Sequence, residues 1–319
     1  MKKFENLNFN SFQWNIKKIT QDFKSYNVLD LHEKINIAII DSGIDYTHEE
    51  FKGKIDHKNS YNFIDNSKNI LDNNGHGTMV AGVICADKLI NGVYHQSNLI
   101  ICKITDYSHY KFRLLLRALK YAIDLNVHII NLSMSFPMKK LSEEALSALE
   151  NIIAEAFKKN IIIVMAAGNK NYILKRNKLN SYQNFLTIGS TDRLGNKSTF
   201  SNYGYVKYLA PGGEFKLETL NESILTTYPT YLSDFDALNS NLGLPKGYVL
   251  CYGTSLSAAH VTGALGYIIS YIYSVTNTKP KVENILKYLD AGIREESKLE
   301  EFNYAGEINI YNSLMKILK

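Results

Sequence analysis

The sequence contains few cysteines, prolines and tryptophans. It has three cysteines, five prolines and one tryptophan in 319 residues. The odd number of cysteines and their spacing argue against a disulfide framework and against a cysteine zinc site. We therefore expect Cys85, Cys102 and Cys251 to be reduced thiols, as is typical of cytoplasmic proteins.

Long hydrophobic runs are also scarce. The segment Met1–Asn6 begins with charged residues, but no apolar stretch of signal-peptide type follows it. Residues 256–278 lack Asp, Glu, Lys and Arg over a length that could cross a bilayer. Ser257, His260 and several small residues in this stretch favour a helix buried in the protein core. We predict no membrane partner and, if Met1 is the native start, a cytoplasmic protein without a signal peptide.

The net charge gives no indication of a nucleic-acid partner. Thirty-six basic residues against 31 acidic ones give a net charge of +5, which is small for this length. We interpret the excess as spread along the chain, whereas nucleic-acid-binding proteins concentrate it in a stripe. There is no internal repeat or Pro/Ser-rich linker, so we predict a single domain over residues 1–319 and a monomer. Residues 214–252 are irregular and are predicted to be a long insertion loop with room for a hairpin.

Short apolar runs alternate with helical patterns along the chain. Five of the runs have the length and composition of buried strands: Ile35–Ile40, Leu99–Ile104, Val127–Leu132, Ile161–Ala167 and Phe185–Gly189. Helices are predicted over Phe112–Asn126 and Ser142–Asn160, the second with a serine cap, acidic residues first and lysines last. This alternation predicts an α/β fold of three layers, with a mostly parallel central sheet flanked by helices.

The residues with the chemistry of an active site follow the predicted strands. Asp41, Ser133 and Gly168-Asn169 each stand just after a strand. Ligands of open parallel sheets bind beyond the carboxyl ends of the strands. We therefore expect these residues to lie along one edge of the sheet.

Three motifs carry the candidate catalytic groups, and each is ambiguous alone. Asp41 in Ile39–Asp45 could be a turn former. His76 in Asn74–Gly82 could cap a helix or bind a metal. Ser255 in Gly253–Gly263 could be an N-cap, and Ser257 replaces the final glycine of the Gly-x-Ser-x-Gly elbow.

Taken together, the three motifs resemble the subtilase family, in the chain order Asp, His, Ser. The resemblance extends from about Trp14 to Asn309. It implies a serine endopeptidase in which Ser255 attacks the peptide carbonyl, His76 transfers the proton and Asp41 orients the imidazole. Val164–Asn169 matches a fourth family motif, which implies that the Asn169 amide stabilises the oxyanion.

The resemblance also implies where a peptide substrate would bind in extended form. Ser133, Met134 and Ser135 match the strand that pairs with substrate, and Ala166, Ala167 and Gly168 match the opposite wall of the S1 pocket. The family often has glycine where this chain has Ser135, which should narrow the pocket or make it more polar. Ala259 replaces a proline that usually follows the nucleophile.

Metal binding is not expected from the sequence. The segment Asp87–Gly92 keeps the length of the family's calcium loop, but Lys88 and Leu89 replace oxygen donors. Glu50 stands where the family often has a carboxylate ligand. We predict no cofactor and assign no metal ligand; calcium remains an alternative that the loop sequence does not support.

The opening segment Phe12–Ile19 resembles the start of lantibiotic leader peptidases. This resemblance predicts bacteriocin maturation, namely removal of the leader from a lantibiotic precursor peptide. A general intracellular subtilase for protein turnover and a catalytically silent binding module on the same scaffold are the alternatives. An NAD- or phosphate-binding α/β protein is disfavoured, because Asp41–Asp45 is not a glycine loop.

Overall fold

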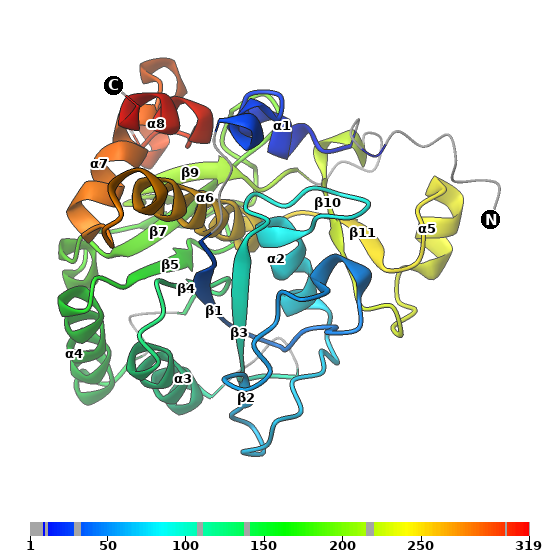
Figure 1. The fold of residues 1–319 in the computed structure, drawn as a ribbon, viewed down its shortest axis with the longest axis horizontal. Helices are drawn as coiled ribbons and strands as arrows, with labels where there is room; N and C mark the ends of the chain where they lie inside the picture. Colours follow the sequence, from blue (N-terminus) through cyan, green and yellow to red (C-terminus); the bar gives the residue numbers. More distant parts are fainter. Residues whose placement is uncertain are drawn as a thin grey trace.

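A seven-stranded parallel sheet forms the centre of the molecule (Figure 1). The computed structural model describes residues 9, 12–28, 33–106, 111–136, 141–214, 220–303 and 305–318. The segment Met1–Asn6, interpreted above as lacking a signal peptide, lies outside the described residues, as do residues 215–219 of the predicted insertion. The strands lie in the order β2-β3-β1-β4-β5-β7-β9. Their bounds are β1 (Ile35–Asp41), β2 (Tyr61–Asn62), β3 (Ser97–Lys103), β4 (Ile129–Leu132), β5 (Ile162–Ala166), β7 (Phe185–Thr191) and β9 (Tyr208–Pro211).

Helices cover both faces of this sheet, so the predicted three-layer α/β fold is confirmed. One face packs against α3 (Phe112–Asp124) and α4 (Glu143–Lys158). The other face packs against α2 (His76–Cys85) and α6 (Thr254–Thr276), with α1, α7 and α8 outside them. Other helices of the described residues are α1 (Trp14–Thr20), α7 (Val282–Gly292), α8 (Ile310–Ile317) and the 3-10 helices η2 (Lys24–Asn27), η3 (Glu49–Phe51), η5 (Lys178–Ser181), η6 (Leu220–Glu222), η7 (Glu295–Ser297) and η8 (Glu300–Phe302).

The sequence of β1 explains why the sheet is covered on both sides. Successive side chains of a strand point to opposite faces. Ile37 and Ile39 lie in the core beneath α6, and Ala38 and Ile40 lie in the core beneath α3. A strand buried on both faces needs apolar residues at every position, which gives the continuous run seen in the sequence.

Helix α6 is the uncharged stretch weighed above as a membrane span. Eighteen of its 23 residues are buried, and its buried apolar side chains belong to the core cluster that packs on the sheet. The prediction of a core helix is confirmed. Among the described residues, no helix is both long enough and apolar enough to span a bilayer.

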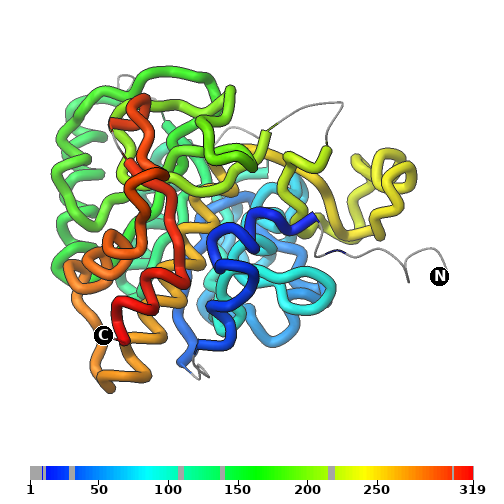
Figure 2. Tube along the Cα trace, turned by 90° about the horizontal axis from the view of Figure 1, so that it is seen from above, coloured from blue at the N-terminus to red at the C-terminus, as the bar shows by residue number. Residues whose placement is uncertain are grey.

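The segment predicted as an insertion contains a small antiparallel ribbon. Strands β10 (Ile224–Thr227) and β11 (Tyr248–Cys251) pair in register, and α5 (Asp236–Leu242) lies between them in sequence. Figures 1 and 2 show α5 projecting from one side of the molecule. Two further two-residue strands, β6 (Ile173–Leu174) and β8 (Tyr203–Gly204), pair in parallel.

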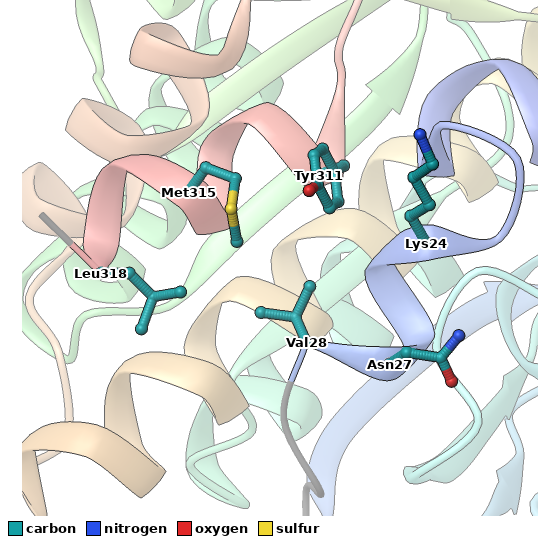
Figure 3. A pocket seen from close by; sticks show the side chains of 6 residues that line it. All are labelled: Lys24, Asn27, Val28, Tyr311, Met315 and Leu318. Carbon is teal, nitrogen blue, oxygen red and sulfur yellow. The ribbon is translucent and has the colours of Figure 1, made fainter.

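An open groove of about 340 Å³ lies between η2 and α8 (Figure 3). Its lining residues are Lys24, Asn27, Val28, Tyr311, Met315 and Leu318. Its η2 wall is anchored where the Tyr267 hydroxyl of α6 donates to the Ser25 carbonyl. Twelve residues separate Tyr267 from Ser255 on that helix, a rise of roughly 18 Å. The groove is therefore remote from the sheet edge that carries the predicted catalytic residues.

Candidate active site

A hydrogen bond joins Asp41 and His76 at the carboxyl end of β1. The Nδ1 of His76 lies 2.8 Å from Oδ1 of Asp41. His76 begins α2, and the glycine after it allows the helix to approach β1 closely. A Cβ on Gly77 would lie 2.1 Å from the carbonyl oxygen of Gly43. Two glycines in separate motifs thus bring the imidazole to the carboxylate.

The Asp41 carboxylate keeps the imidazole basic although the site is partly closed to water. Burial opposes the charged imidazolium, but the negative charge of Asp41 and its hydrogen bond favour it, with a smaller contribution from Asp72. The net effect raises the pKa of His76 above its ordinary value. Because Asp41 lies on the Nδ1 side, Nε2 is the nitrogen left to exchange a proton with a substrate or nucleophile.

Ser255 lies in the first turn of α6 and faces the end of β4. Its Oγ donates to the carbonyl of Ser133 at 2.8 Å, and the Ser133 Oγ donates back to the carbonyl of Ser255 at 2.8 Å. Among the described residues, Ser255 forms no hydrogen bond with His76. Rotation about χ1 between staggered wells would redirect the hydroxyl, and catalytic hydrogen bonds are often loose before substrate binds.

Thr254 fixes the side chain of Asn169. The Oδ1 of Asn169 accepts hydrogen bonds from the Thr254 backbone N–H at 2.9 Å and from its hydroxyl at 2.7 Å. The same hydroxyl accepts from the backbone N–H of Gly168 at 3.0 Å. The carboxamide oxygen is therefore occupied, and the Nδ2 of Asn169 is a donor without a hydrogen-bond partner among the described residues. An amide held this way is suited to stabilise negative charge on a substrate oxygen.

The two predicted substrate-binding segments face each other across a narrow gap. A Cβ on Gly168 would lie 2.8 Å from the Oγ of Ser135 and 2.5 Å from the Nδ2 of Asn202. Ser133 is buried, Met134 is half-buried and packs partly against the α3 side of the core, and Ser135 is exposed. Ala166 and Ala167 are buried at the end of β5. The structure thus brings all six residues to one edge, with Ser135 narrowing the space.

The ribbon β10–β11 contributes contacts that the sequence analysis did not predict. The hydroxyls of Thr226 and Thr227 each donate at 2.7 Å to carbonyls of α2, those of Met79 and Thr78. The ring of Tyr228 lies over Gly75, where an added Cβ would meet it at 2.3 Å. This strand therefore supports the turn that presents His76. The signal was weak, since threonines and a tyrosine in an irregular segment have no distinctive spacing.

The buried carboxylate of Glu50 is enclosed by hydrogen-bond donors. Its two oxygens accept from the backbone N–H groups of Asp87, Lys88, Leu89 and Ile90 at 2.6–3.1 Å. The Tyr248 hydroxyl donates to it at 2.8 Å. A calcium site needs six to eight oxygen ligands, whereas this loop turns N–H groups toward the carboxylate. These residues do not fit calcium, and the described part of the chain contains no cluster of acidic, His or Cys residues that could hold a metal.

Comparison with known proteins identifies the family. The profile of the subtilase family matches residues 32–289. The chain belongs to the subtilase family. The predicted resemblance is confirmed, and the protein is a serine peptidase and hydrolase.

Several relatives show how far the similarity of this subtilase extends. The major intracellular serine protease of Bacillus subtilis is 30% identical over 75% of this chain and 69% of its own length. The epidermin leader peptide-processing protease EpiP of Staphylococcus epidermidis is 26% identical over 95% of this chain and 74% of its own length. The crystal structure of a lanthipeptide protease superposes with a TM-score of 0.87 at 26% identity, covering 99% of this chain and 98% of that one.

Proposed function

We propose that this subtilase removes the leader peptide from a lantibiotic precursor. The observation that carries the proposal is the extent of the likeness to leader-processing proteases. The family profile ends at residue 289, whereas the match to EpiP covers 95% of the chain and that to the lanthipeptide protease 99%. The similarity therefore includes the terminal regions outside the common core, among them α1, where the sequence resemblance began.

The geometry supports the following proposed roles. Ser255 attacks the scissile carbonyl while His76 Nε2 accepts its proton and later passes it to the leaving amine. Asp41 holds the imidazole through Nδ1 and stabilises its charged form. The Asn169 amide and the backbone N–H of Ser255 bind the developing oxyanion. The acyl-enzyme is then hydrolysed by water through the same groups.

The substrate is proposed to bind in extended form between the two facing segments. Ser133–Ser135 would pair with its backbone, and Ala166–Gly168 would form the opposite wall. The Oγ of Ser135 would stand 2.8 Å from a Cβ at Gly168, so the two walls approach closely at this point and leave little width for a large P1 side chain. We therefore expect the residue before the cleaved bond to be small or polar rather than a large aromatic one.

A direct test compares substrates of the two leading classes. The purified chain is incubated with a lanthionine-containing precursor peptide and, separately, with casein, and cleavage is followed by mass spectrometry. Cleavage of the precursor at one bond, together with slow casein hydrolysis, supports leader removal. Rapid casein digestion with an untouched precursor contradicts it. The Ser255→Ala variant controls for contaminating proteases.

Protein turnover is the second candidate function. The 30% identity to the major intracellular serine protease of Bacillus subtilis favours it. A broad peptide-library cleavage profile would support this function.

We also propose a cytoplasmic location, because Cys85, Cys102 and Cys251 are all free thiols and Cys85 and Cys102 are fully buried.

A further inference from the structure

Basic residues are concentrated in one segment beside the active site. From Lys170 to Lys207 the sequence has seven Lys or Arg and one Asp, a net charge of +6. The whole chain carries +5, so the rest of it has a net charge of −1. The expectation that the basic excess is spread along the chain was therefore wrong.

Several of these cations lack a carboxylate partner. Lysines outside the segment form ion pairs, such as Lys54 with Asp87, and within the segment Lys178 pairs with Glu150. Within the described ranges, Lys170 and Lys175 are exposed and make no ion pair. Lys197 donates to the Asn171 side chain at 2.8 Å and lies 5.2 Å from the centre of the Tyr203 ring. These contacts leave the lysine charges uncompensated.

Exposed apolar side chains lie among these cations. Tyr172 is 64% exposed, Ile173 61% and Tyr205 38%. Large apolar groups gathered on a surface mark binding sites more often than single exposed ones do. We call Lys170, Tyr172, Ile173, Lys175, Lys197 and Tyr205 the basic aromatic surface.

The backbone holds this surface in place and connects it to the oxyanion donor. Strand β6 pairs with β8, and the Tyr203 N–H donates to the Tyr172 carbonyl at 3.0 Å. The Oδ1 of buried Asn202 accepts from the N–H groups of Lys170 and Tyr172 at 3.1 and 2.9 Å. Lys170 itself directly follows Asn169. The surface is therefore a rigid extension of the active-site edge rather than a separate site.

We propose that the basic aromatic surface binds an acidic stretch of the peptide substrate, next to the bond that is cleaved. This inference rests on the proposed peptidase function and specifies its substrate class. Carboxylates would meet the unpaired lysines, and apolar side chains between them would pack on Tyr172 and Ile173. Charge complementarity favours this occupant over a neutral peptide, and contiguity with Asn169 favours a substrate over an unrelated partner.

The experiment uses internally quenched peptides that share one cleavable core chosen from a peptide library. Each is extended at one end by three Glu or by three Gln, and both ends are tested. The intact chain should prefer the Glu peptide at one end, and added salt should weaken that preference. In Lys170→Glu/Lys175→Glu, the ratio of the two kcat/KM values should fall roughly three- to tenfold. Lys287→Glu/Lys316→Glu, the same charge change on exposed residues of α7 and α8, is the matched control.

The outcomes separate the surface from the proposed function. Rates are normalised to sites labelled by a fluorophosphonate, so a chain that is neither labelled nor active counts against the peptidase function. Peptide binding to the surface is then measured separately, as the fluorescence anisotropy of the same peptides in the presence of the Ser255→Ala variant, which leaves them uncleaved. An equal Glu preference in Lys170→Glu/Lys175→Glu and in Lys287→Glu/Lys316→Glu overturns the inference. Binding to a DNA duplex is measured in parallel, because DNA would also be attracted by the unpaired lysines. If Lys170→Glu/Lys175→Glu loses DNA binding but keeps its preference for the Glu peptide, the inference is also overturned.

Discussion

Thr254 holds the Asn169 carboxamide from two directions, through its backbone N–H and its hydroxyl. The hydroxyl is in turn fixed by the Gly168 N–H. The residue before the nucleophile thus determines where the oxyanion donor points. Thr254 acts through Asn169, so it is a positioning residue rather than a catalytic one.

Thr254→Val should lower kcat with little change in KM. Loss of the hydroxyl leaves one of two hydrogen bonds on the Asn169 oxygen, so the amide samples unproductive orientations. We expect a loss of about tenfold, smaller than the 10²–10³ expected for Asn169→Ala. Thr254→Ser keeps the hydroxyl and should restore kcat. If Asn169→Ala and the Asn169→Ala/Thr254→Val double variant differ by that same tenfold factor, the effect does not pass through Asn169.

Removal of Ser255 or His76 should abolish turnover to a similar extent. Groups that act as one unit give non-additive losses, so each alanine variant and the double variant should all lose on the order of 10⁶ in kcat. Fluorophosphonate labelling of Ser255 should disappear in Ser255→Ala and fall sharply in His76→Ala. Normal labelling of His76→Ala would contradict the assignment of this imidazole as the base.

The acidic limb of the pH–rate profile should report His76. The imidazole accepts a proton only when neutral, so kcat/KM should rise with pH through the pKa of His76. Asp41 raises that pKa, which places the midpoint above pH 6.5. In Asp41→Asn, kcat should fall about 10⁴-fold and the midpoint should move lower, since burial then acts without the carboxylate. A midpoint that stays fixed in Asp41→Asn would show that another group titrates.

Buried His260 should make the protein less stable in mild acid. Its Nδ1 donates to the Leu256 carbonyl at 2.7 Å, and its Nε2 lies 2.8 Å from the Asn15 amide nitrogen, so the ring is neutral. Burial lowers the pKa of His260 to about 4. Between pH 6.5 and 4 the unfolded chain binds a proton that the folded chain does not, so stability present above pH 6.5 is lost by about 3 kcal/mol as pH falls.

Urea unfolding across this pH range measures the effect. His260→Gln should be less stable at pH 7, yet its stability should depend less steeply on pH, by the equivalent of about one proton. His57→Gln, a histidine on the surface loop before β2, is the control. An identical pH slope in His260→Gln and the intact chain would refute the assignment.

Glu50→Gln should destabilise the loop at Asp87–Ile90. The amide nitrogen would face backbone N–H groups that now point at a carboxylate oxygen, leaving buried donors unpaired. We expect a loss of about 3 kcal/mol in the free energy of unfolding, the cost of buried donors left without an acceptor. Because these residues do not fit calcium, a chelator should leave the melting temperature of the intact chain unchanged. A large fall on chelation would contradict this interpretation of the loop.

Much of the fold could be predicted from the sequence because the central strands are buried on both faces. The runs at Ile35–Ile40 and Phe185–Gly189 form β1 and β7. The serine cap predicted for the second long helix, α4, is present, because the Ser142 Oγ accepts a hydrogen bond from the Ala145 N–H. The two-residue strands β6 and β8 were not predicted, since two residues show no periodicity. Helix α5 was missed because Asn, Ser and Asp favour turns over helices.

The candidate site was predictable to the extent that single residues carry its chemistry. Asp41, His76 and Asn169 are marked by motifs, and the structure places them at one sheet edge. The residues that orient them act through hydroxyls and ring faces, as Thr254 and Tyr228 do. Those contacts join segments far apart in the chain, so local patterns could not reveal them.

The ribbon β10–β11 gives the fold a mechanical link between its two catalytic helices. The hydroxyls of Thr226 and Thr227 donate hydrogen bonds to carbonyls of α2, and β11 leads directly into the turn that begins α6. A shift of this ribbon would move His76 and Ser255 relative to one another. Substitutions in α5, at the outer end of the ribbon, would therefore change the rate of cleavage from a distance. The sheet and its core would keep their structure.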